Sequence, residues 1–235
     1  MWSYYGSKSK IVDYYPTPKF QKIIEPFAGS AKYALKYFEK DVLLVDKYEP
    51  IIKLWKWLQL CSPNDIKKLP VLKQGDDIRN IAGLCEEERI LLGYGAQAGV
   101  AIFGNTVTEA GTRNMVTMFK NVANNLHKIK HWEIRLGCYK DIANEEATWF
   151  IDPPYQFGGH KYKHSNKKID FKELADWCKE RNGQTIVCEN MKADWLEFKA
   201  LKKIQGLAQT GTIEAIWSNH KTNYDNVQVS LFEGM

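Results

Sequence analysis

The chain contains 235 residues, which suits one catalytic domain carrying one modest insertion better than two independent domains. Its 44% hydrophobic and 26% charged residues exclude a disordered or fibrous protein, whereas the net charge of +5 fits either ordinary solubility or a polyanionic partner. No run approaches the roughly 20 apolar residues of a membrane helix, and the first ten residues lack the apolar region of a signal peptide. We therefore expect a cytoplasmic protein without membrane contact.

The first part of the chain predicts a βαβα unit, because short apolar runs alternate with segments of helical periodicity. The expected elements are, in order, a strand at 23–27, a turn at 28–30, a helix at 31–39 capped by Ser30, a strand at 42–45 that ends at Asp46, and a helix at 51–60.

The character of the sequence changes at 61–130, where helical patterns surround a stretch rich in Gly and Asn and strand signals are weak. We expect a mostly helical insert there, with helices at 86–92 and 114–129. Strands then return at 132–136, 147–151, 185–188, 213–217 and 227–232, with a helix at 171–181. The segments 1–60 and 131–235 are therefore expected to form one α/β catalytic domain.

The sharpest motif is Asp152-Pro153-Pro154-Tyr155, directly after the apolar strand at 147–151. Two consecutive prolines stiffen the backbone and remove two N–H donors, which leaves carbonyl oxygens beside a carboxylate and an aromatic ring. Asp152 and the Pro153 carbonyl could accept the two hydrogens of a base's amino group and stabilise charge developing on its nitrogen. Tyr155 could stack on that base once it is swung out of the duplex.

A second motif is the strand-to-helix turn Glu25-Pro26-Phe27-Ala28-Gly29-Ser30, followed by Asp46 at the end of the next strand. Glycine lets the backbone approach a ligand closely, and a carboxylate ending the second strand is well placed to accept hydrogen bonds from a ribose. The chain has neither a G-x-G-x-x-G fingerprint nor a G-x-x-x-x-G-K-[ST] loop, which argues against a dinucleotide or a nucleoside triphosphate. A nucleoside cofactor without a pyrophosphate is expected.

With these motifs in this order, the sequence resembles the Dam-type, or D12-class, family of DNA adenine-N6 methyltransferases, particularly its bacteriophage members. The resemblance implies a Rossmann-like S-adenosylmethionine-dependent methyltransferase sheet with a target-recognition insert, acting on double-stranded DNA. By similarity, the cofactor would be bound by the first motif (Tyr5, Gly6, Lys8), the glycine turn, Asp46 as the ribose-binding acid, and Asp141 with Ile142 beside the cofactor's adenine. Asp152 to Tyr155 would be the catalytic motif.

The resemblance has two departures at the cofactor motifs. The family has two glycines before the lysine where this chain has Gly6-Ser7-Lys8, and Phe is commoner than Ile142 after its aspartate. The insert is also shorter than in the best-known members, so the resemblance implies no target sequence.

Candidate DNA contacts lie in two segments. His160, Lys161, Lys163, Lys167 and Lys168 follow the catalytic motif closely and would contact phosphates, although a solvated surface loop has the same composition. Arg113 and Asn114, in the insert, have side chains suited to base edges, and a helix-capping turn is the equally plausible reading. His160 and His164 have a spacing used at some metal sites, but the lysines repel cations and no third ligand is evident, so no metal is expected.

Several alternatives stay open at this level. An N4-cytosine enzyme would use the same chemistry, although its motif more often begins with Ser. An RNA or protein amino-group methyltransferase and a catalytically inactive DNA-binding module on the same fold are the others. The five cysteines contain no C-x-x-C pair, which argues against disulfides and zinc, and we expect a monomer or a weak dimer.

Overall fold

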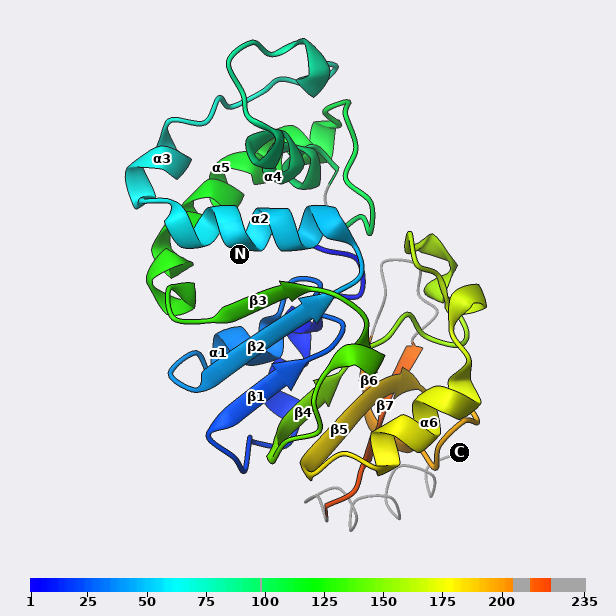
Figure 1. Cartoon of the computed structure of the whole chain (residues 1–235). Coiled ribbons are helices and arrows are strands. Elements are labelled where there is room, and N and C mark those ends of the chain that lie inside the picture. The colour runs from blue at the N-terminus through cyan, green and yellow to red at the C-terminus, as the bar shows by residue number, and fades with distance from the viewer. Residues whose placement is uncertain (98, 205–211, 221–235) are drawn as a thin grey trace.

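The computed structural model describes residues 1–97, 99–204 and 212–220, and within them seven strands form one mixed sheet in the order β3-β2-β1-β4-β5-β7-β6 (Figure 1). The strands are β1 (Lys22–Glu25), β2 (Asp41–Asp46), β3 (Glu133–Leu136), β4 (Ala147–Ile151), β5 (Gly183–Asn190), β6 (Lys199–Ile204) and β7 (Thr212–Ser218). The first five strands in this order are parallel, and β7 runs antiparallel to both β5 and β6. The fold is therefore α/β, and its strand order is consistent with a Rossmann-like methyltransferase sheet.

The helices cover both faces of the sheet. They are α1 (Lys32–Lys36), α2 (Glu49–Leu60), α3 (Pro63–Lys67), α4 (Glu86–Ala96), α5 (Glu109–Asn125) and α6 (Phe171–Lys179), with 3₁₀ turns at Lys8–Lys10, Val12–Tyr14, Ile78–Asn80, Leu126–Ile129, Tyr139–Asp141, Gly159–Lys161 and Asn166–Lys168. Figure 1 shows α6 on the near side of the sheet next to β5, and α2 beside β3 with the insert helices α3, α4 and α5 beyond it. None of the described helices is long and apolar enough to cross a membrane.

The central strands are apolar on both faces because each face meets a helical layer. On β4, Trp149 and Ile151 pack in one hydrophobic cluster with α6, whereas Phe150 belongs to the other cluster, with α1 and α2. Successive side chains of a strand point to opposite faces, so this division follows from the pleat. A parallel sheet buried on both sides explains why β4 reads as an apolar run with Thr148 as its one polar residue.

The segment 61–130 does not have a core of its own among the described residues. Helices α3, α4 and α5 pack on one another and reach the sheet through α2, whose Trp55 lies in the same hydrophobic cluster as Tyr94 and Met115. Trp2 also joins this cluster, with its ring centroid 4.8 Å from that of Trp55 and 6.0 Å from that of Tyr94. The N-terminal segment therefore connects the insert to the rest of the fold.

Most expected elements are confirmed, with shifts at their ends. The predicted cap at Ser30 is wrong, because the residue before α1 is Ala31 in a left-handed conformation (φ 44°) and no side chain caps the helix. Helix α1 is also shorter than the expected 31–39, and α5 begins at Glu109, ahead of the expected start at 114. No pattern in the sequence indicated β6, and the strand expected at 227–232 lies outside the described residues.

Candidate functional site

A cavity of about 270 Å³ opens at the carboxyl ends of β1, β2 and β4. It is lined by residues at the ends of these strands, including the turn after β1, Asp46 as the last residue of β2 and Asp152 directly after β4. Strands β1 and β4 are neighbours at the point where the strand order reverses direction. Open α/β sheets bind their ligands at such points, outside the carboxyl ends of the strands.

The glycine turn is held in place by its neighbours. Gly29 has φ 43°, in the left-handed region that glycine adopts readily, and its carbonyl accepts a hydrogen bond from Trp55 Nε1 at 2.9 Å. The backbone N–H of Ala28 donates to the carbonyl of Val45 at 3.0 Å, and that of Gly29 donates to Asp46 Oδ2 at 3.1 Å. The turn after β1 is thereby fixed to the end of β2.

Asp46 keeps hydrogen-bonding capacity for a ligand. Its Oδ1 accepts from the Tyr48 backbone N–H at 2.8 Å and its Oδ2 from Gly29, which uses about two of the roughly four lone pairs of a carboxylate. Burial raises the pKa of Asp46 above its usual value, and the backbone hydrogen bonds oppose that shift. The carboxylate is thus oriented by the backbone and lines the cavity.

Lys8 joins the N-terminal segment to the end of β4. Its Nζ lies 2.7 Å from Asp152 Oδ1, and the two side chains are only 7% and 22% exposed. Nζ also donates to the Gly6 carbonyl at 3.1 Å. Burial raises the pKa of Asp152 to about 6 although Lys8 opposes the shift; for Lys8, burial alone would lower the pKa, but Asp152 and Glu214 raise it. The pair is an ionic contact between the N-terminal motif and the motif Asp152 to Tyr155.

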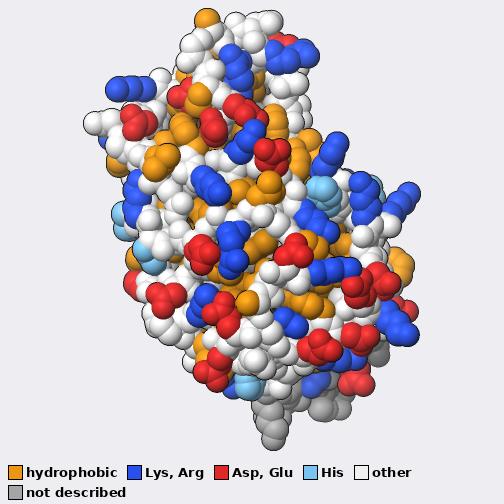
Figure 2. All heavy atoms as spheres, in the orientation of Figure 1, with side chains coloured by type: hydrophobic (Ala, Val, Ile, Leu, Met, Phe, Trp, Pro, Cys, Tyr) orange, Lys and Arg blue, Asp and Glu red, His pale blue; other side chains and the backbone are white. Residues whose placement is uncertain are grey.

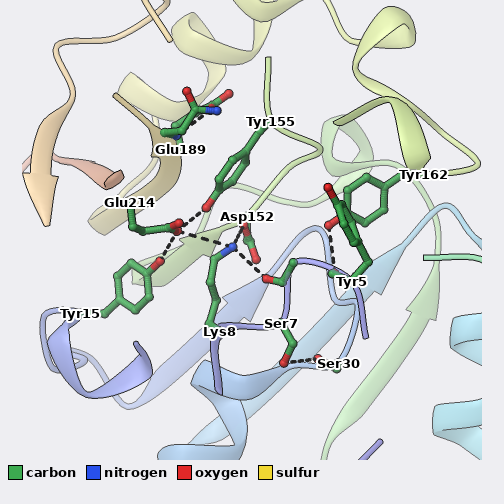
Figure 3. A network of polar contacts seen from close by, with 12 residues as sticks. Tyr5, Ser7, Lys8, Tyr15, Ser30, Asp152, Tyr155, Tyr162, Glu189 and Glu214 are labelled. Atoms are coloured by element: carbon green, nitrogen blue, oxygen red, sulfur yellow. Dashed lines mark hydrogen bonds and ion pairs between the residues drawn. The ribbon is translucent and has the colours of Figure 1, made fainter. Parts of the chain in front are cut away.

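Tyr155 does not line the cavity, and its side chain is held by Glu214 (Figure 3). Its hydroxyl donates to Glu214 Oε1, which also accepts from the Tyr15 hydroxyl at 2.6 Å. Lys8 Nζ sits over the Tyr155 ring, 4.7 Å from its centroid. One face of this ring is therefore covered by an ammonium group, and the stacking of a base on Tyr155 stays a prediction.

On the other side of Asp152 lie Tyr5 and Tyr162, which both line the cavity (Figure 3). The Tyr162 hydroxyl donates to the Tyr5 carbonyl at 3.1 Å, and the two ring centroids are 5.5 Å apart. Gly6, with φ 71°, brings the backbone against the Tyr162 hydroxyl, where no side chain would fit. The N-terminal segment and the loop after Tyr155 thus meet at the cavity.

Glu25 is a buried carboxyl group at the base of the same cavity, 3% exposed. Its Oε1 accepts a hydrogen bond from the Ala34 backbone N–H at 2.7 Å. Burial raises the pKa of Glu25 to about 8, and the Ala34 bond opposes the shift. Glu25 is therefore protonated at neutral pH.

Of the other expected site residues, the structure brings Pro26, Phe27, Ser30 and Pro154 to the cavity wall. Pro153 is buried away from it. Asp141 and Ile142 are not among the lining residues: Asp141 is exposed and Ile142 packs in the core under α6. Their neighbours Tyr139 and Lys140 line the cavity instead.

The lysine loop, 159–168, is a structured segment of two 3₁₀ turns. Asn166 Nδ2 donates to the Gln156 carbonyl at 2.7 Å, and the buried Glu189 accepts from the Gln156 backbone N–H at 2.5 Å. Within the loop, Lys163, His164 and Lys168 line the cavity, whereas His160, Lys161 and Lys167 are exposed outside it. Figure 2 shows Lys, Arg and His side chains gathered at the right margin of this face, where the loop projects.

Arg113 and Asn114 lie inside the first turns of α5, so their interpretation as part of a helix-capping turn is wrong. Thr108 is the cap, and its side chain accepts from the Gly111 backbone N–H. Arg113 Nη1 pairs with Glu109 Oε1 at 2.5 Å on the exposed side of the helix. The residues are accessible, but the structure does not bring them to the cavity.

Glu214, Glu189 and Tyr162 were not anticipated from the sequence. An acidic residue inside the apolar strand at 213–217 was the visible signal for Glu214, because a carboxylate is rarely buried without partners. No group of three or more His, Cys, Asp or Glu side chains that could hold a metal is found in the described part of the chain, and all five cysteines are free thiols.

No family model matches the chain, and no curated protein is similar enough in sequence to match. The function is therefore inferred from the site.

Proposed function

We propose that the protein transfers a methyl group from S-adenosylmethionine to the N6 amino group of an adenine in DNA. The observation that carries this proposal is the shared cavity: the glycine turn, Asp46 and Asp152 line one space at the switch point of the sheet. A nucleoside cofactor and a target base would then meet there. The strand order supports the proposal at the level of the fold.

The residues present fit this cofactor. Asp46 has lone pairs left for two ribose hydroxyls, and the fixed turn at Gly29 offers close backbone approach. The cofactor would be cationic at its sulfonium and amino groups and anionic at its carboxylate, and the cavity wall carries side chains of both signs, among them Asp46, Asp170, Lys32 and Lys140. When bound, it supplies an activated methyl group.

Asp152 would act on the target amine. Its carboxylate lines the cavity and would accept an amine hydrogen and stabilise positive charge as the nitrogen attacks, whereas Pro153, buried away from the cavity, takes no part in this contact. After transfer the nitrogen carries one proton too many, and a carboxylate with a pKa of about 6 could take it up before release to solvent. Lys8 would keep this carboxylate oriented through its 2.7 Å contact.

The lysine loop would hold the DNA around the extruded base. Lys163 and Lys168 line the cavity while Lys161 and Lys167 are exposed beside it, an arrangement that suits phosphates flanking one displaced nucleotide. Such contacts fix the position of the protein on the duplex and do not depend on the base sequence.

The test is to incubate the protein with S-adenosylmethionine labelled at the methyl group and with DNA of mixed sequence, followed by digestion to nucleosides. N6-methyldeoxyadenosine as the labelled product, absent with Asp152→Ala, supports the proposal. N4-methylcytosine as the only product would refute the adenine assignment. Label found only on RNA or protein supplied in parallel would refute DNA as the substrate.

A further inference from the structure

We infer that Glu214 is a positioning residue of the site: through one oxygen it holds the hydroxyl of Tyr155 and shares Lys8 with Asp152. This inference deepens the proposed function and rests on it. Glu214 lies on the antiparallel strand β7, far along the chain from either motif, and its side chain is 7% exposed.

The geometry places three donors around Glu214 Oε1. The Tyr155 hydroxyl and the Tyr15 hydroxyl both donate to it, and Lys8 Nζ is 3.6 Å away (Figure 3). Burying an anion is costly unless it is paired and hydrogen-bonded, so the two hydroxyls and the ammonium stabilise this carboxylate in place. Glu214 is in turn the partner that fixes the orientation of the Tyr155 ring.

The charges around Lys8 do not balance within the cluster. Lys8 is one cation placed between the carboxylates of Asp152 and Glu214, which leaves the trio with one net negative charge. Because Glu214 competes for Lys8 and adds its own negative field, it raises the pKa of Asp152, while burial is the larger cause and Lys8 opposes both. Removal of the Glu214 charge should therefore lower the pKa of Asp152.

The other titratable groups near Asp152 come from several elements. Cys188 and Glu189 lie on β5, Glu25 on β1, Tyr162 in the lysine loop, and Tyr155 directly after the two prolines that follow Asp152. Burial raises the pKa of each of these groups, so the thiol and the hydroxyls stay neutral near neutral pH. Glu214 is distinguished from Glu25 and Glu189 by its contact with Lys8.

The experiment compares Glu214→Gln, which keeps the shape and removes the charge, with Glu214→Asp, which keeps the charge and shortens the side chain. The Asp152 carboxyl is titrated by NMR of protein labelled with ¹³C-Asp, with its signal assigned by Asp152→Asn. Single-turnover methylation is measured over the same pH range. The control is Glu145→Gln, which removes another paired carboxylate, 2.7 Å from Lys22, before β4 and away from the cavity.

We expect Glu214→Gln to move the Asp152 titration and the acid limb of the rate profile together to lower pH, by about one unit. Glu214→Asp should keep the titration near that of the wild type but lower kcat, as Tyr155→Phe should, without weakening S-adenosylmethionine binding. An Asp152 titration that is the same in Glu214→Gln, Glu145→Gln and the wild type would overturn the inference.

The titration needs no activity, so the two proposals fail separately. A wild-type protein that methylates no substrate refutes the proposed function, and the NMR titration then still decides whether Glu214 sets the charge of Asp152. If Glu214→Gln fails to fold, Glu214→Asp decides. If the kcat of Glu214→Asp equals that of the wild type, the inference is overturned, because the shorter side chain would not hold the Tyr155 hydroxyl and catalysis would not need that contact.

Discussion

Lys8 Nζ and Asp152 Oδ1 lie 2.7 Å apart, so an ammonium group from the N-terminal segment is paired with the acid at the end of β4. The two residues are 144 positions apart in the sequence, and both line the cavity. Because Lys8 opposes the rise in the pKa of Asp152 that burial causes, the pair favours the ionised carboxylate, which can accept hydrogen bonds.

Replacement of Asp152 by Ala should abolish methyl transfer while S-adenosylmethionine binding remains. The loss of one preorganised group that stabilises transition-state charge typically costs about 100- to 1,000-fold in rate. Single-turnover rates and calorimetric titration of the cofactor measure the two properties. Because Asp152 has a pKa of about 6 and acts as the carboxylate, the wild-type rate should fall as the pH drops through that value. Near wild-type activity of the variant would refute the catalytic role.

Replacement of Lys8 by Met should destabilise the fold in a pH-dependent way. Once Lys8 is removed, Asp152 is a buried acid without its ionic partner, and the loss of one partner of a buried ion pair lowers the free energy of unfolding by about 3 to 5 kcal/mol. In this variant the pKa of Asp152 in the folded protein rises further above its value in the unfolded chain. The free energy of unfolding therefore decreases as the pH rises between these two pKa values. Urea unfolding at pH 5 and pH 8 measures this effect. The double variant with Asp152→Asn should recover much of the stability at pH 8, and no recovery would mean that the pair is not the cause.

Asp46 should serve the cofactor and not the DNA. Asp46→Ala removes a carboxylate acceptor and should weaken S-adenosylmethionine binding by about 1.5 to 3 kcal/mol. A side chain at Gly29 should also obstruct the turn, because its φ is positive and a Cβ would stand 3.0 Å from the Tyr4 ring. Calorimetry of the cofactor with each variant tests both expectations, and unchanged affinity in Asp46→Ala would contradict the first.

Glu25 should make the ligand-free protein less stable as the pH rises. Its folded pKa of about 8 lies above the ordinary value of 4.5, so the folded state holds the proton more tightly than the unfolded state. The contribution of protonated Glu25 to the free energy of unfolding is therefore fully present below pH 4.5 and decreases progressively as the pH rises to about 8. Glu25→Gln keeps the oxygen that accepts from Ala34 and cannot ionise, so its unfolding free energy should vary less over this range. If the unfolding free energy of the wild type and that of Glu25→Gln change with pH to the same extent, Glu25 is not protonated in the folded protein.

The sequence predicted the centre of the sheet better than its edge. The central strands are buried on both faces and read as apolar runs, which is why 147–151 matches β4 residue for residue. Strand β6 was not predicted because, among the described residues, it lies at the edge of the sheet with one partner, β7, and its lysines at 199, 202 and 203 interrupt the apolar pattern.

The sequence predicted those site residues that lie next to one another in the chain. It missed those that reach the site through contacts between distant segments. The turn after β1 and the motif after β4 could be found locally, whereas the contact of Glu214 with Tyr155 joins positions brought together only by the antiparallel strand β7. Likewise, the exposure of Asp141 and the burial of Ile142 depend on how the segment after β3 packs under α6.

The lysine loop should contact the phosphates around the extruded base, and the structure divides its lysines into two pairs. Lys161 and Lys167 are exposed outside the cavity, whereas Lys163 and Lys168 line it. Removal of one phosphate contact should flatten the log-log dependence of DNA affinity on salt by up to about 0.9. Lys161→Gln with Lys167→Gln should therefore reduce the slope without changing S-adenosylmethionine affinity, whereas Lys163→Gln with Lys168→Gln should affect both.

The control replaces Lys19 and Lys179, two exposed lysines near the amino ends of β1 and β5, at the opposite edge of the sheet from the cavity. It removes the same charge from the protein and so corrects for the change in net charge. Affinities for duplexes of two unrelated sequences, measured over a salt series, should fall equally, because phosphate contacts position the protein without reading bases. A slope that falls as much in the control would assign the effect to net charge alone, and a decrease confined to one duplex would mean that the loop reads sequence.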